Sequence, residues 1–300
     1  MVEKQIIQRC RLILLLTFAI AISGCGKSEK ARQELAGMNI EYTDANFIES
    51  ARQGNAEAVK LFLDAGMDIE AKTRDRQTAL MVAALGNRVD IVKLLLDYGA
   101  DVNAKNKFNG TALMSAAWKG NSEIVQLLVG EGADLGMKDD RGMNPLMFAA
   151  WENHTEIVKW LLDKGAEVDA RDGNGWTALM RAAFKGYSEP VKALIAKGAN
   201  VNARSNNGDM ALISAAEGGH TDTIKLFLDH GTDLNARNNE KKTALIKAVE
   251  KGHTEAAKAL IDKGADLNAT DMNGKTALNL AEDQRRPEIV QLLKSTGAAK

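Results

Sequence analysis

The segment TALMSAAWKGNSEIVQLLVGEGADLGMKD, residues 111–139, decides the fold because its pattern returns along the chain. A leucine or phenylalanine recurs at an unbroken interval of 33 residues, at Phe47, Leu80, Leu113, Leu146, Leu179, Leu212, Leu245 and Leu278. A fixed period of that length means that one supersecondary unit is copied along the chain and stacks on its neighbours. The sequence therefore predicts an elongated array, which offers a surface more readily than a deep pocket.

Each copy of the unit reads as two short helices. Residues 111–119 place small and apolar side chains on one face of a first helix. Gly120 ends it, because glycine tolerates the left-handed conformation of a helix C-terminal turn. A second helix follows with Ile124 and Leu128 facing inward, and it closes at Gly132. An extended segment, clearest at residues 99–104, and a polar turn then lead into the next copy.

This unit resembles the ankyrin repeat, which has the same period and consists of a β-turn finger and two antiparallel helices. The resemblance implies an all-α repeat solenoid of about eight helix-turn-helix units joined by β-turn fingers. We expect the array in residues 41–300, with repeats near 41–73, 74–106, 107–139, 140–172, 173–205, 206–238, 239–271 and 272–300. The sequence departs from the family's T-P-L-H pattern, because an apolar side chain replaces the histidine at Met81, Met114, Met147, Met180, Ile213 and Ile246.

The first 24 residues are typical of a targeting segment. Lys4, Arg9 and Arg11 form a positive region, and the apolar run over residues 12–22 is shorter than the roughly 20 residues of a comfortable membrane span. The run ends in Ile-Ser-Gly-Cys, which resembles the bacterial lipobox. The resemblance implies a lipoprotein signal peptide over residues 1–24 and a diacylglycerol on the thiol of Cys25. An ordinary signal peptide, or a short anchor with a chance cysteine, is the alternative.

The lipobox resemblance also implies a location. Residues 25–40 would be the lipidated cysteine and a polar tether, partly helical over residues 31–36. The protein would then be lipid-anchored in the bacterial cell envelope and face the periplasm, and Gly26 after the cysteine leans towards the outer membrane. Once residues 1–24 are removed, Cys25 is the single cysteine left, so no intramolecular disulfide is possible and packing alone stabilises the array.

Recurring ionisable residues are explained by the stack rather than by chemistry. An acidic residue begins every second helix, where it favours the helix dipole, and adjacent copies about 8–10 Å apart cannot share a proton. His154, His220 and His253 occupy one column and are expected to form turn hydrogen bonds rather than to bind zinc. We expect no catalytic residue, metal or cofactor. The net charge of −1 and the lack of basic tracts argue against nucleic acid as a partner.

In ankyrin proteins the fingers and the first helices line a concave groove, and its variable positions carry specificity. One such column reads Leu85, Trp118, Trp151, Phe184, Glu217, Glu250 and Asp283, so it changes from aromatic to acidic along the array. The candidate partner-binding residues are Trp118, Trp151, Phe184, Trp176, Phe148, Phe108, Arg141, Met143, Lys119 and Lys185. Alternatively, Trp118, Trp151 and Phe184 pack on one another between helices. Lys119, Arg181 and Lys185 would complement an acidic partner.

The resemblance therefore implies a membrane-tethered protein-protein interaction module, a scaffold or adaptor, that is monomeric and binds an unidentified protein on the groove. An inhibitor or immunity protein for an envelope-acting enzyme is a narrower alternative that the sequence does not separate from it. An enzyme or small-ligand binder is less favoured, because it needs convergent polar groups in a deep pocket.

Overall fold

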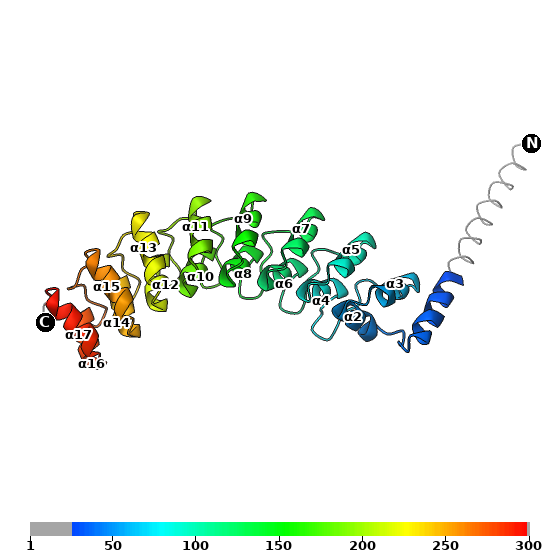
Figure 1. The fold of residues 1–300 in the computed structure, drawn as a ribbon, viewed down its shortest axis with the longest axis horizontal. Helices are drawn as coiled ribbons and strands as arrows, with labels where there is room; N and C mark the ends of the chain where they lie inside the picture. Colours follow the sequence, from blue (N-terminus) through cyan, green and yellow to red (C-terminus); the bar gives the residue numbers. More distant parts are fainter. Residues whose placement is uncertain (1–25, 299–300) are drawn as a thin grey trace, which may run out of the picture.

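In the computed structural model, which describes residues 26–298, the chain forms a long, gently curved row of helix pairs that follow one another in sequence order (Figure 1). The helices between Asp44 and Ser295 in this part are α2 (Asp44–Gln53), α3 (Ala56–Asp64), α4 (Ala79–Leu85), α5 (Val89–Asp97), α6 (Ala112–Lys119), α7 (Ser122–Gly130), α8 (Pro145–Trp151), α9 (Thr155–Asp163), α10 (Ala178–Lys185), α11 (Ser188–Ala196), α12 (Ala211–Gly218), α13 (Thr221–Asp229), α14 (Ala244–Lys251), α15 (Thr254–Asp262), α16 (Ala277–Asp283) and α17 (Pro287–Ser295). Within residues 26–298 no strand forms apart from an isolated bridge between Thr270 and Thr276. The predicted all-α repeat solenoid is confirmed.

Local chemistry fixes the ends of the first helix in each repeat. In α6, the hydroxyl of Thr111 accepts a hydrogen bond from the backbone N–H of Met114 at 3.2 Å, which satisfies an otherwise unpaired helix-start donor. Gly120 ends the helix with φ of 78°, in the left-handed region. Most of the other first helices begin with the same kind of cap, whereas α12 begins at Met210 without a side-chain cap.

The core is a continuous row of aliphatic side chains between the two layers of helices. The leucine and phenylalanine anchors of the 33-residue period are at most 2% exposed. The methionines that stand in the histidine position of the family pattern are also buried, with Met147 and Met180 fully enclosed. Burial of these side chains supplies the main driving force for stacking.

Hydrogen bonds join each repeat to the next on two sides. In the fingers, the backbone N–H of Asp140 donates to the carbonyl of Phe108 at 3.0 Å, and neighbouring fingers repeat this contact. On the other side, His154 Nε2 hydrogen-bonds to the carbonyl of Trp118 at 3.0 Å, and His220 and His253 bond in the same way to the preceding repeat. The sequence predicted that these histidines would form turn hydrogen bonds, and their side chains do not bond within their own turns. They instead reach the carbonyls left unpaired at the end of the preceding first helix.

The histidine contacts also explain a glycine that the sequence ascribes to helix termination alone. A Cβ atom on Gly120 would lie 2.5 Å from the ring of His154. The glycine therefore permits both a left-handed turn and the close approach of the next repeat.

Residues 26–37 form a helix that packs on the first repeat. Leu35 is fully buried, Ala31 is 4% exposed, and the hydroxyl of Ser28 donates to the carbonyl of Ala65 at 2.8 Å. This helix is longer than the one expected over residues 31–36 of a polar tether. The signal peptide and Cys25 lie outside the described residues. In residues 26–298, no helix combines the length and the apolar character that crossing a bilayer requires.

Candidate partner-binding groove

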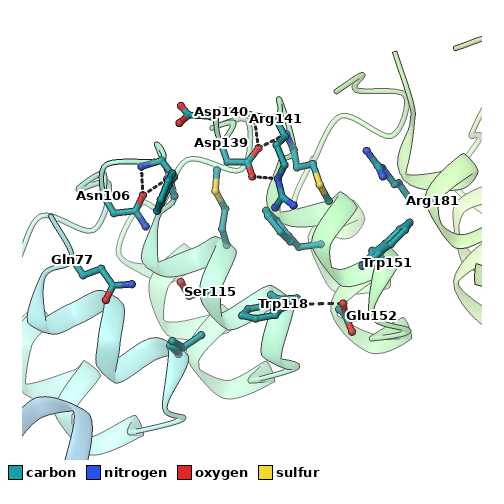
Figure 2. Close-up of a pocket in the computed structure, with 16 residues that line it drawn as sticks. Gln77, Asn106, Ser115, Trp118, Asp139, Asp140, Arg141, Trp151, Glu152 and Arg181 are labelled. Atoms are coloured by element: carbon teal, nitrogen blue, oxygen red, sulfur yellow. Dashed lines mark hydrogen bonds and ion pairs between the residues drawn. The ribbon is translucent and has the colours of Figure 1, made fainter. Parts of the chain in front are cut away.

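A groove of about 680 Å³ opens between the fingers and the first helices of the second to fifth repeats (Figure 2). Helices α4, α6, α8 and α10 contribute its floor and one wall, and the fingers before α6 and α8 contribute the other wall. Its lining residues are Gln77, Leu85, Asn106, Phe108, Gly110, Met114, Ser115, Trp118, Asp139, Asp140, Arg141, Met143, Phe148, Trp151, Glu152 and Arg181. "The groove" below means this set.

Two aromatic side chains of the groove are left open to solvent. Phe108, on the finger before α6, is 55% exposed, and Trp118, near the end of α6, is 42% exposed. The indole Nε1 of Trp118 donates to Glu152 Oε1 at 3.1 Å, which holds the ring in place across the groove (Figure 2). Large exposed aromatic residues in a hollow are typical of the anchors that dominate protein interfaces.

Three other candidate aromatics pack on one another instead. The rings of Trp151 and Phe184 are stacked with centroids 6.1 Å apart, and Trp176 meets Phe184 edge-on at 5.8 Å. The guanidinium of Arg181 lies about 5 Å from the rings of both tryptophans. For these three rings, inter-repeat packing is therefore what the structure contains, and Trp118 lies outside this aromatic cluster of Trp151, Trp176 and Phe184.

Buried aspartates hold the fingers in shape. The carboxylate of Asp172 accepts the backbone N–H groups of Asn174 and Trp176 at 2.8 and 2.9 Å, and it also pairs with Arg181, whose Nε lies 3.1 Å away. Asp139 serves the preceding finger in the same way, and Arg141 Nε donates to it at 3.0 Å. These carboxylates are used inside the protein, so they add little negative charge to the groove surface.

The cations beside the groove lie on aromatic faces. The ammonium of Lys119 is 4.3 Å from the ring centroid of Trp118, and that of Lys185 is 4.9 Å from the ring of Trp151. Neither lysine forms an ion pair with any residue between 26 and 298. The side chain of Arg141 is 68% exposed and lies over Phe148 at 5.6 Å. Lys119 and Lys185 therefore place positive charge beside the groove, whereas the charge of Arg141 is paired with Asp139.

The C-terminal part of the variable column is different, because its acids already have partners. Glu217 pairs with lysines of α14, and Glu250 Oε1 accepts from Lys242 at 2.9 Å. Asp283 accepts from Lys275 at 2.6 Å. Beside this network, Asp209 is 7% exposed and accepts from the Asn238 side chain at 2.8 Å, and burial raises the pKa of its carboxyl. The acidic column seen in the sequence is therefore internally neutralised.

The structure separates the ten candidate residues into three groups. Phe108, Trp118, Arg141, Met143, Phe148 and Trp151 line the groove, and Lys119 and Lys185 flank it on indole faces. Trp176 and Phe184 lie outside the lining and form the aromatic cluster together with Trp151. Sequence reasoning did not single out Gln77, Ser115 and Glu152 as lining residues. Their columns also vary between copies, and that variation is the signal that could have found them. Among the described residues, no group of three potential ligands is placed to hold a metal ion.

Comparison with known proteins identifies the repeat. A family model described as ankyrin repeats, three copies, matches residues 20–106, 47–139, 113–205, 146–238, 191–271 and 212–300, which together cover most of the chain. No curated protein matches the chain.

Proposed function

Because the chain belongs to the ankyrin-repeat family, whose arrays are interaction modules and generally not enzymes, we propose that it is a membrane-tethered scaffold or adaptor of the bacterial cell envelope. Its protein partner binds in the groove. The observation that carries this assignment is the exposure of two aromatic side chains that line the groove, Phe108 at 55% and Trp118 at 42%. Burial of apolar surface at about 25 cal/mol per Å² would make these two rings the principal anchors.

The partner site is tested by affinity capture from envelope extracts. The double variant Phe108→Ala, Trp118→Ala removes both exposed rings, whereas Met272→Ala removes a side chain that is 64% exposed on a finger far from the groove. We expect a protein that is retained by the parent chain and by Met272→Ala and lost with the double variant. Equal capture by all three chains would refute the groove as the partner site.

The tether rests on the lipobox-like sequence that ends at Cys25. Two or more acyl chains on one residue give stable membrane attachment, since each buried methylene contributes about 0.8 kcal/mol. The helix of residues 26–37 is packed on the first repeat, so a lipid at Cys25 would hold the array close to the membrane surface. Its location on the periplasmic side, with the outer membrane favoured over the inner, is part of the same proposal.

Mass spectrometry of the mature N-terminus tests the tether. We expect a chain that begins at Cys25 and carries a diacylglycerol and a further acyl chain, and a Cys25→Ser chain that leaves the membrane fraction. A Cys25→Ser chain that stays membrane-bound, or a mature N-terminus elsewhere, would contradict the assignment.

A further inference from the structure

We propose that the occupant of the groove is an acidic segment of the partner that also carries apolar side chains. This inference deepens the proposed function and rests on it. The inference rests on two lysines that have no ion pair within residues 26–298, on aromatic rings whose faces are covered by the protein's own cations, on the apolar side chains of the groove and on the spacing of the two lysines.

The first step is the charge that remains after internal pairing. The side chain of Asp172 is 1% exposed and that of Asp139 is 9% exposed, and both are engaged by finger backbone and arginine. Asp140 and Glu152 also line the groove without an ion pair to any described residue, and each accepts a hydrogen bond, from Asn109 and from Trp118. Lys119 and Lys185 are engaged by indole rings alone within residues 26–298. A carboxylate from a partner can therefore approach either lysine without breaking an existing ion pair, so acidic side chains of the partner fit at these two positions.

The second step concerns the faces of the rings. Lys119 covers Trp118, Arg141 covers Phe148, and Lys107 covers Phe108 at 4.9 Å. A ring face is the place where an aromatic groove attracts an incoming cation. Since the protein's own cations already occupy these faces, a cation of a basic segment would have to displace them, and the ring faces select against such a segment.

The third step concerns the apolar part of the occupant. Phe108 and Trp118 line the groove from a finger and from the end of α6, and Met114 and Met143, which are 3% and 4% exposed, line it as well. Methionine adapts its shape to different apolar neighbours. An aliphatic or aromatic side chain that enters the groove would bury apolar surface against these residues.

The fourth step sets the spacing of the acidic residues. Lys119 and Lys185 are two repeats apart in the array, which at about 8–10 Å per packed helix corresponds to roughly 16–20 Å. An extended chain rises about 3.3 Å per residue. In an extended occupant, the two carboxylates would therefore be about five to six residues apart, with the apolar side chain between them.

The test is selection of binders from a random 12-residue peptide library on the full chain in detergent, followed by fluorescence anisotropy with the selected peptides. We expect peptides with two carboxylates about five to six positions apart and a central apolar residue. The double variant Lys119→Glu, Lys185→Glu should weaken their binding at least tenfold. Lys60→Glu with Lys258→Glu, the same charge change on exposed second helices, should leave binding unchanged, and a peptide with its acids changed to lysine should bind better to the first double variant than to the parent.

The outcomes separate this inference from the proposed function. Selected peptides that are basic or uncharged, yet are lost with Phe108→Ala, Trp118→Ala, would overturn the acidic occupant and leave the groove as the partner site. Acidic peptides insensitive to the lysine reversals would also overturn it. If the selected peptides bind equally well to the Phe108→Ala, Trp118→Ala chain, the proposed function itself fails.

Discussion

Trp118 and Trp151 occupy the same position of adjacent repeats, yet their replacement by alanine should have very different effects on stability. Trp151 stacks on Phe184 with an interplanar angle of 5° and faces Arg181 and Lys185 at 5.2 and 4.9 Å. The ring pair is worth about 0.5–1.5 kcal/mol beyond burial, and each cation contact about 0.5–1 kcal/mol. With the burial lost from a partly buried indole, Trp151→Ala should cost about 3 kcal/mol.

Replacement of Trp118 removes fewer stabilising contacts. Its ring is 42% exposed, and its specific contacts are one hydrogen bond to Glu152 and one cation contact with Lys119. Exposed contacts of these kinds are each worth about 0.5–1 kcal/mol or less. Trp118→Ala should therefore cost about 1 kcal/mol or less, so that the binding test made with it reports on the groove and not on unfolding.

Urea unfolding followed by far-UV circular dichroism measures the difference. The free energy of unfolding is taken to fall by about 3 kcal/mol per M urea. A stability loss of about 3 kcal/mol then lowers the urea concentration at the unfolding midpoint by about 1 M, and a loss of about 1 kcal/mol lowers it by about 0.3 M. The double variant Trp151→Ala, Phe184→Ala should cost less than the sum of the single variants, because both remove the same contact. Equal midpoints for Trp118→Ala and Trp151→Ala would refute the division between exposed anchor and packed cluster.

Three further changes test the internal chemistry of the array. His220→Ala removes the hydrogen bond to the Phe184 carbonyl, and it should lower the free energy of unfolding in urea by about 1 kcal/mol. Gly120→Ala should lower the melting temperature more than Gly274→Ala, because both glycines have positive φ but a Cβ at Gly274 meets no atom within 4 Å; similar losses would contradict the close-approach argument. Burial raises the pKa of Asp209, so the folded state binds this proton more tightly than the unfolded state, and its contribution to stability falls as pH rises from the ordinary aspartate value of about 3.9 through the folded value. Asp209→Asn should therefore melt at a higher temperature than the parent at pH 7 and at the same temperature at pH 3, and an equal difference at both pH values would exclude this titration.

The fold could be predicted from the sequence because a repeated position reports its environment many times. Every copy of the Leu113 position is leucine or phenylalanine, and most copies of the Met114 position are apolar, so both positions are indicated as buried without any knowledge of the fold. The histidine contacts could not be predicted in the same way. His154, His220 and His253 share a column, which indicates a common role, but periodicity does not say whether the hydrogen-bond partner lies in the same repeat or in the preceding one.

The site could be predicted only in part, because the surroundings of each groove residue depend on neighbouring side chains that differ from one repeat to the next. Trp118 and Trp151 share a column, and the sequence offered both a binding surface and inter-repeat packing for them. What separates them is Arg181, which lies in the repeat after Trp151 and reaches both Asp172 and two indole rings. The corresponding residue in the repeat after Trp118 is Phe148, which has no charge with which to form such a bridge. Two identical residues of one column therefore have different surroundings.

The two halves of the array differ in how their charged side chains are paired. In the seventh repeat, the side chain of Lys242 is 14% exposed and forms ion pairs with Glu240 and Glu250. Both ion pairs must break before its ammonium can bind a partner. Breaking a partly buried pair is costly, because the separated charges must find other partners or water. Lys119 forms no ion pair within residues 26–298, so none has to break when a partner binds. A charged segment therefore gains more from the third to fifth repeats than from the sixth to eighth, although the same column lines both halves of the array.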